Sequence, residues 1–98
     1  MNVRFTPRAE SDTEAKRKWW RENRDKAPYL FDDELDEAVT KIRVDPTTIG
    51  AVFASSFPST VRRVLMPKTK NNVFFAIIDG EIVILSVWGA PRGRGPKL

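Results

Sequence analysis

The stretch NVFFAIIDGEIVILSVW, residues 72–88, decides the fold because it predicts two apolar strands joined by a tight turn. Asp79-Gly80 is a strong signal for a two-residue β-hairpin turn. We therefore expect strands over about residues 72–78 and 81–88. In both strands the alternating positions are apolar on either side, so neither face of the hairpin is polar. Strands of this kind have to be covered on both faces.

Two helices are expected upstream of this hairpin. Residues 2–6 alternate as a short first strand, and Thr6-Pro7 then reads as an N-cap followed by proline at the first helical position. The first helix is expected from Pro7 to about residue 25. The second opens at Pro28 and ends at Asp45-Pro46. Its apolar residues recur at helical spacing in one stripe, made of Phe31, Leu35, Ala38, Val39 and Ile42.

The remaining segments complete a single domain over residues 1–98. Residues 46–60 predict an irregular connection with a short extra strand near Val52 and Phe53, and a further strand is expected at about 61–66. Residues 91–98 form a basic tail that is too rich in Gly and Pro for regular structure. The sequence thus predicts an α+β fold of order β-α-α-β-β-β, in which a helical hairpin packs on one face of a small antiparallel sheet.

The second face of this sheet has no helix to cover it. One helical hairpin covers one face, and the other is left for the tail, the 46–60 segment or another chain. We expect another chain, because the two segments are short and rich in Gly, Pro and Ser, and because a large apolar patch usually marks an interaction site. The residues predicted to form this partner surface are Phe74, Ile78, Ile82, Ile84 and Trp88.

The charge of the chain is uneven. There are 17 Lys and Arg against 13 Asp and Glu, a net charge of +4. Residues 60–70 and 91–98 are basic and contain no acid, which suggests an anionic partner, but from charge alone ordinary solvation of a small protein is the favoured interpretation. Six basic residues are expected to converge at one rim of the sheet if the strands at 61–66 and 81–88 both flank the strand at 72–78. They are Arg62, Arg63, Lys68, Lys70, Arg92 and Arg94.

Several kinds of chemistry find no support in the composition. The chain has no cysteine and no histidine, so it lacks thiolate chemistry and both the commonest general base and the commonest metal ligand. Its one tyrosine, Tyr29, falls at the start of the second predicted helix. A carboxylate such as Glu81 or a lysine of lowered pKa is conceivable as a base for RNA cleavage, but the sequence singles out neither. We predict no catalytic residue, metal or cofactor.

The sequence also gives an expected compartment. It contains no apolar run long enough to span a bilayer, and its charged start does not read as a signal peptide. The cytoplasm is therefore expected.

Residues 61–98 resemble the C-terminal half of the ParE/RelE toxin superfamily, nearer the ParE side. The features that carry the resemblance are the Arg62-Arg63 pair, the Leu65-Met66-Pro67 strand end, the basic loop, the hairpin, and the Val87-Trp88-Gly89 exit followed by Arg92. The first half agrees in the order and kind of its elements. The resemblance implies the toxin of a type II toxin–antitoxin system, held in a hetero-oligomer by a cognate antitoxin that wraps around it.

The sequence departs from the family at the positions that matter for RNA cleavage. Many relatives carry histidine or tyrosine in the segment matching residues 71–75, and RelE-type ribonucleases carry one near residues 88–92; none is present here. This favours a ParE-like toxin that binds DNA gyrase and stalls it. A RelE-like ribosome-dependent mRNA endoribonuclease, a plain nucleic-acid-binding module and a toxin that has lost activity are the alternatives. The expected target surface is the six basic residues with Trp88 as an aromatic anchor.

Overall fold

The structure is a computed structural model that describes residues 1–89 and 95–98. Its elements follow the expected order, and the extra strand predicted near Val52 and Phe53 is present. They are β1 (Val3–Phe5), α1 (Pro7–Asn23), α2 (Leu30–Val44), β2 (Ala51–Phe53), β3 (Val61–Met66), β4 (Asn71–Ile78) and β5 (Glu81–Gly89).

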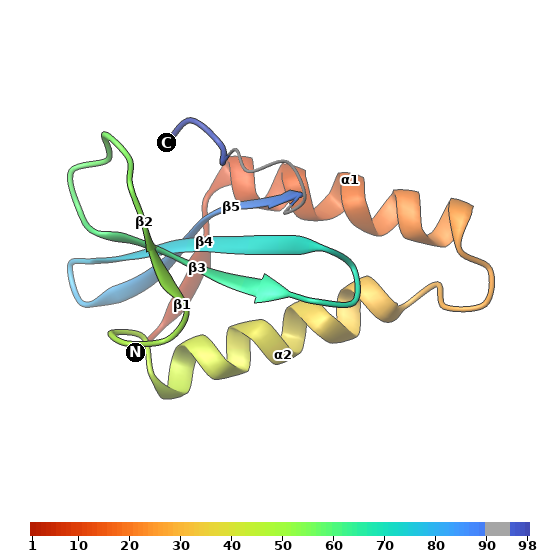
Figure 1. Cartoon of the computed structure of the whole chain (residues 1–98), viewed down its shortest axis with the longest axis horizontal. Coiled ribbons are helices and arrows are strands. Elements are labelled where there is room, and N and C mark those ends of the chain that lie inside the picture. Colours follow the sequence, from red (N-terminus) through yellow and green to blue (C-terminus); the bar gives the residue numbers. More distant parts are fainter. Residues whose placement is uncertain (90–94) are drawn as a thin grey trace.

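The five strands form one sheet in the order β1-β5-β4-β3-β2 (Figure 1). The pairs from β2 to β5 are antiparallel, as expected, whereas β1 adds to the outer edge of β5 in parallel and makes the sheet mixed. β3 and β5 both flank β4, which is the arrangement that the predicted basic rim requires. The α+β prediction, with its helical hairpin on a small sheet, is confirmed.

The helices begin for local reasons that the sequence partly reveals. Thr6 is the N-cap of α1, since its side chain accepts a hydrogen bond from the N–H of Ala9, and Pro7 follows it. α2 begins at Leu30 rather than at Pro28, because a turn closed by the Leu30 N–H and the Ala27 carbonyl comes first. Among the described residues, neither helix has the length and apolar character needed to cross a membrane.

The front face of the sheet is the face that the helices cover. Across β4 and β5, Ile77 lies opposite Ile82 and Phe75 lies opposite Ile84, so each pair shares a face. Phe75, Ile82 and Ile84 are at most 1% exposed and pack in one cluster with helix residues such as Phe31. The expectation that Ile82 and Ile84 belong to the second face is therefore wrong.

The hairpin turn explains this correction. Asp79 and Gly80 both have positive φ, as a two-residue turn of this type needs, and they set Ile78 opposite Glu81. Even-numbered residues at the start of β5 consequently fall opposite odd-numbered residues of β4. The β5 residue that joins Ala76 on the second face is Val83, not a neighbouring isoleucine.

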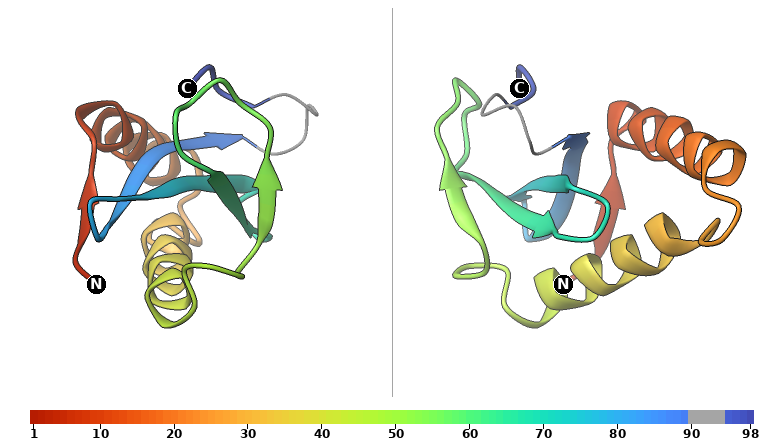
Figure 2. Two further views of the ribbon diagram at one scale, coloured as in Figure 1. Left: turned by 90° about the vertical axis from the view of Figure 1, so that its left-hand side faces the viewer. Right: turned by 45° about the vertical axis from the view of Figure 1, so that its right-hand side comes forward.

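The second, rear face has its own buried cluster, and the chain itself covers it. The cluster consists of Val61, Phe74, Ala76, Val83 and Leu85, with Phe53, Phe57, Ile78 and Leu98 packed against it. Figure 2 shows the β2–β3 connection and the C-terminal end lying across the sheet from α2. The expectation of a bare rear face is thus corrected: the 46–60 segment and residues 95–98 close over it, although neither forms a helix.

α1 protects the outer edge of β5 where β1 no longer reaches. β1 pairs with β5 only as far as Ile84, which leaves the backbone beyond it without a neighbouring strand. The Asp12 carboxylate accepts hydrogen bonds from the Ser86 hydroxyl at 2.7 Å and from the Val87 N–H at 3.1 Å. This contact satisfies a strand edge that no further strand covers and that could otherwise pair with another chain.

Candidate functional site

The adjacent arginines of β3 project to opposite faces, as strand alternation predicts. Arg62 donates hydrogen bonds to the backbone carbonyls of Ile49 at 2.8 Å, Thr48 at 2.9 Å and Gly50 at 3.3 Å. Arg63 is exposed. Arg62 therefore clamps the connection between α2 and β2, whereas Arg63 presents its charge to solvent on the rear side.

The loop between β3 and β4 carries the two predicted lysines, Lys68 and Lys70, and Glu34 of α2 holds its backbone in place. The Glu34 carboxylate accepts hydrogen bonds from the Lys68 N–H at 2.7 Å, the Thr69 N–H at 2.9 Å and the Thr69 hydroxyl at 2.7 Å. Glu34 is 5% exposed. Burial alone would raise its pKa, but these hydrogen bonds outweigh it and hold the pKa below the ordinary value. The loop backbone is thereby fixed and its lysine side chains point outward.

Sequence reasoning missed this role of Glu34. The acidic residues 32–37 of the second helix suggest a solvated face, but Glu34 is buried. A signal was present, because position 34 lies three residues after Phe31 and directly before Leu35, within the apolar stripe. A carboxylate on the buried side of a helix needs hydrogen-bond donors, and the loop supplies them.

A basic and aromatic cleft separates this loop from the outer half of α1. It has a volume of about 820 Å³. Its lining includes Lys16, Trp19, Trp20 and Arg24 from α1, and Lys68, Thr69, Lys70 and Asn71 from the loop and β4. None of the described residues that line it is acidic. We refer to this hollow as the basic cleft.

Two features of the α1 wall shape the chemistry of the basic cleft. The guanidinium of Arg24 lies 4.9 Å from the ring centre of Trp19 and 5.8 Å from that of Trp20. Burial lowers the pKa of Lys16, and the nearby Asp12 offsets part of that effect. Lys16 and Trp20 lie four residues apart, and Arg24 follows after four more, so one helix face gathers them. That spacing was the signal for this wall, and sequence reasoning did not use it.

The rear rim of the sheet carries the predicted aromatic anchor. Trp88 is 40% exposed and lies opposite Asn72, which in turn lies opposite the exposed Leu65. The Arg8 guanidinium stands 5.7 Å from the Trp88 ring centre and also donates to the carbonyl of Lys97. Arg8 thus links the rim to the tail that covers the rear face.

The sheet does not gather all the predicted basic residues at one place. Lys68 and Lys70 lie at the loop end together with Trp88, whereas Arg62 and Arg63 lie farther along β3, toward β2. Arg92 and Arg94 lie outside the described residues.

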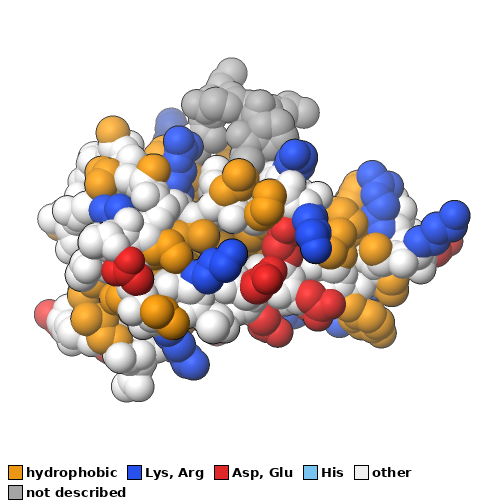
Figure 3. Space-filling model, turned by 60° about the horizontal axis from the view of Figure 1, so that its bottom comes forward, with side chains coloured by type: hydrophobic (Ala, Val, Ile, Leu, Met, Phe, Trp, Pro, Cys, Tyr) orange, Lys and Arg blue, Asp and Glu red, His pale blue; other side chains and the backbone are white. Residues whose placement is uncertain are grey.

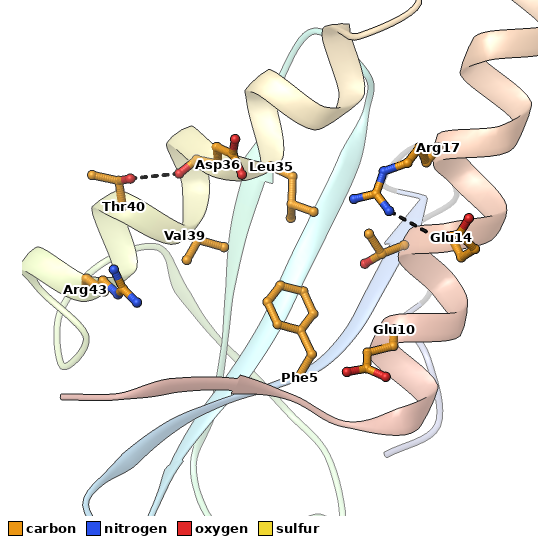
Figure 4. Close-up of a pocket in the computed structure, with 10 residues that line it drawn as sticks. Phe5, Glu10, Glu14, Arg17, Leu35, Asp36, Val39, Thr40 and Arg43 are labelled. Atoms are coloured by element: carbon orange, nitrogen blue, oxygen red, sulfur yellow. Dashed lines mark hydrogen bonds and ion pairs between the residues drawn. The ribbon is translucent and has the colours of Figure 1, made fainter.

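A second hollow runs between the two helices (Figure 4). Its volume is about 590 Å³, and Phe5, Leu35 and Val39 supply apolar side chains to it. Glu10, Glu14 and Asp36 also line it. In the space-filling view of the side on which α2 lies, acidic side chains gather near the middle with basic side chains beside them (Figure 3). Arg17 and Arg43 line it as well, so the groove is of mixed charge, unlike the basic cleft.

The described residues include few side chains placed for acid–base or metal chemistry. Tyr29 lies at the tip of the helical hairpin, with the Arg21 guanidinium 5.6 Å from its ring centre, and it does not line the basic cleft. Over residues 1–89 and 95–98, no group of three or more His, Cys, Asp or Glu side chains is placed to hold a metal ion. What the arrangement offers is the binding of anions and of flat rings.

Comparisons with known proteins connect the fold to solved structures. A chromosomal ParDE TA system from P. aeruginosa matches with 19% identity and a TM-score of 0.65, covering 93% of this chain and 97% of that one. The intact E. coli RelBE toxin–antitoxin complex matches with 17% identity and a TM-score of 0.57, covering 93% and 98%. The YoeB dimer from Staphylococcus aureus matches with 19% identity, a TM-score of 0.57 and the same coverage. No protein-family model and no curated protein sequence matches.

Proposed function

We propose that this chain, which has the fold of the ParE and RelE toxins, is the toxin of a type II toxin–antitoxin pair. The observation that carries the proposal is the match of the whole architecture, over 93% of the chain, to a ParDE system and to the RelBE complex. The sequence of residues 61–98 independently resembles the same superfamily. The ParE side is favoured, because the family's usual histidine and tyrosine positions hold other residues here.

The antitoxin is proposed to dock on the rear face. That face is apolar, and it is covered by Phe53 at the end of β2 together with the β2–β3 connection and residues 95–98, which form no helix or strand. A short segment without helix or strand opens at a lower free-energy cost than a packed helix, so we propose that the antitoxin displaces it. The antitoxin would then lie over Phe74, Ile78 and Trp88 and replace Leu98.

The cellular target is proposed to be a macromolecule bound without catalysis, with DNA gyrase as the candidate. Arg63 and Trp88 are exposed on the rear side, and the loop lysines extend that surface at its end. Arginine and tryptophan are the residue types that most often dominate protein–protein binding. Arg92 and Arg94 complete the proposed target surface from the sequence.

Induction of the chain in bacteria tests this function. We expect growth arrest, rescue by the antitoxin encoded beside it, and loss of gyrase supercoiling activity in extracts of the same culture. Arg63→Ala and Arg92→Ala should relieve arrest while the thermal midpoint of the purified variants stays that of the parent. Arg43→Ala, on α2 at the front face, is the matched control, and this variant should still arrest growth. Full toxicity of both test variants at equal expression would contradict the proposed surface.

A second candidate is a ribosome-dependent mRNA endoribonuclease, and Lys16 is the observation in its favour. Lys16 is half-buried beside the loop lysines, and burial lowers its pKa, so it is the residue that we propose as the base in this alternative. Mapping messenger 5′ ends after induction decides between the two functions. New cleavages that disappear in Lys16→Arg would support the enzyme, and intact messages would remove it.

A further inference from the structure

We infer that Lys16 is an acylation site, at which small acyl phosphates transfer their acyl group to the side-chain amine. The inference goes beyond the proposed toxin function, because it assigns a covalent modification and the chemical class of its donor. Two features of the basic cleft carry it: the half-buried position of this one amine, and the cations that line the cleft around it.

Lys16 differs in burial from every other lysine of the chain. It is half-buried, whereas the others are exposed. Its side chain lines the basic cleft beside Trp20, which lies one turn farther along α1 and packs against the front cluster. Lys16 therefore presents an amine to an open hollow at a place where protein, rather than water, makes up part of its surroundings.

Partial burial makes this amine a better nucleophile. Acyl transfer needs the neutral amine, because an ammonium has no lone pair to donate. Burial lowers the pKa of Lys16, and the charge of Asp12 offsets only part of that effect. At neutral pH a larger fraction of Lys16 is therefore in the reactive form than of a lysine at the ordinary pKa of 10.5.

The cations of the basic cleft favour a donor that carries phosphate. Arg24 lines the cleft from the end of α1, and Lys68 and Lys70 line it from the β3–β4 loop, while no described lining residue is acidic. The loop backbone is already fixed, since the Glu34 carboxylate accepts hydrogen bonds from the N–H groups of residues 68 and 69. A phosphate leaving group would find positive charge there without a rearrangement of the loop. The cleft, at about 820 Å³, is large enough for a small acyl phosphate.

The transfer needs no reactant besides the acyl phosphate. The lone pair of the neutral Lys16 Nζ attacks the acyl carbon, an N–C bond forms, and the bond between that carbon and the phosphate oxygen breaks. Phosphate leaves with the electron pair, and the proton released from the nitrogen passes to water. The product is an amide, so the basic cleft loses one positive charge. The chain has no cysteine and no histidine, so neither side chain competes for the acyl group.

The test is mass spectrometry of the purified full-length chain after incubation with acetyl phosphate at neutral pH. Peptide mapping gives the initial acetylation rate of each lysine. Lys16 should react at least about threefold faster than Lys18, whose side chain is 74% exposed on the same helix and does not line the cleft. With N-hydroxysuccinimidyl acetate, a neutral donor, the preference for Lys16 should be smaller, because the cations of the cleft act on the phosphate.

Substitution of the cations separates their effect from that of burial. Lys68→Ala and Arg24→Ala should each slow acetylation of Lys16 by acetyl phosphate about twofold or more, and should leave its reaction with the neutral donor nearly unchanged. Lys41→Ala is the matched control, since Lys41 is exposed on α2 and does not line the cleft, and it should change neither rate. Circular dichroism of each variant verifies that the fold is intact.

Two results would overturn the inference. They are equal acetylation rates of Lys16 and Lys18 with acetyl phosphate, and equal effects of Lys41→Ala and Lys68→Ala on the rate at Lys16. Neither growth arrest nor a cellular target enters these measurements. Their failure therefore leaves the toxin proposal standing, and a chain that does not arrest growth would still show the fast site.

Discussion

The two faces of the sheet are buried to the same degree but covered by different means. Phe74 and Phe75 are neighbours in β4, each is 1% exposed, and they point to opposite faces. Helix side chains such as Phe31 and Leu35 close the front face, whereas the end of β2, the β2–β3 connection and residues 95–98 close the rear. The comparison teaches that equal burial can be reached by different covers: helices close the front face, and the rear cover is the one that we propose the antitoxin displaces.

The largest effect should separate these two phenylalanines. Phe75→Ala removes a ring packed between strands and helices, and should lower the free energy of unfolding by about 3–5 kcal/mol. Phe74→Ala should cost roughly 1–2 kcal/mol less, because the loops that cover it can close over the cavity. Urea unfolding of both variants gives the difference. Equal losses would mean that the rear cover is as rigid as the helical one.

A smaller effect should come from Glu34, the buried carboxylate of α2 that accepts hydrogen bonds from the β3–β4 loop. Glu34→Gln keeps the shape but loses the charge that accepts three hydrogen bonds, and should destabilise the fold by about 1–3 kcal/mol. Glu37→Gln, on the exposed side of the same helix, is the control and should change stability by less than about 0.5 kcal/mol. Similar losses in both variants would contradict the anchoring role.

The same residue predicts a pH dependence. The pKa of Glu34 is lower in the folded chain than its ordinary value of 4.5, so the folded state binds this proton less readily than the unfolded state. Its contribution to stability is therefore complete above pH 4.5 and is lost as pH falls below that value toward the folded pKa. Thermal midpoints of the parent should fall over this window more steeply than those of Glu34→Gln. Parallel curves of thermal midpoint against pH for the two proteins would contradict a lowered pKa of Glu34.

The adjacent arginines of β3 also lie on opposite faces, and their substitutions should change the free energy of unfolding by smaller amounts. Arg62→Ala removes the clamp on residues 48–50 and should cost about 1–2 kcal/mol, since three carbonyls lose a charged donor. Arg63→Ala, on the rear side, should cost less than about 0.5 kcal/mol. Chemical unfolding measures both. A larger loss for Arg63→Ala would show that the rear side is the more tightly built.

The smallest effect should come from the tail. A Cβ at Gly95 would lie 2.2 Å from the Phe53 ring, so Gly95→Ala should push the tail off the rear face. We expect a stability loss below about 1 kcal/mol, because the tail buries few side chains. Binding of a hydrophobic dye should rise in Gly95→Ala and stay unchanged in Lys97→Ala, whose side chain is exposed. No rise in dye binding would argue that the tail contributes little to the cover.

The sequence predicted most of the fold because its local signals are strong. The apolar hairpin, the Thr6-Pro7 helix start and the stripe of the second helix each depend on neighbours in the chain. The face on which Ile82 and Ile84 lie also follows from the sequence, since a two-residue turn at Asp79-Gly80 sets Ile78 opposite Glu81 and therefore Ile77 opposite Ile82. The prediction that both isoleucines lie on the second face neglected this register.

Other features were not local enough to predict. The closure of the rear face depends on where irregular segments settle, and residues such as Phe57 and Leu98 have no periodic pattern around them. The basic cleft joins α1 to a loop about fifty residues away, so only one of its walls was foreseen. Glu34 shows the general difficulty, because its partners are backbone N–H groups that every loop possesses.

The measurement that tests the exchangeable rear cover most directly is a distance between two spin labels on it. The chain has no cysteine, so Ser55→Cys and Lys97→Cys provide two unique attachment points in the two covering segments. In the free chain we predict one short, narrow distance distribution. Adding the cognate antitoxin should lengthen and broaden it as the antitoxin takes the place of the tail over Phe74. An unchanged distribution at saturating antitoxin would contradict the account.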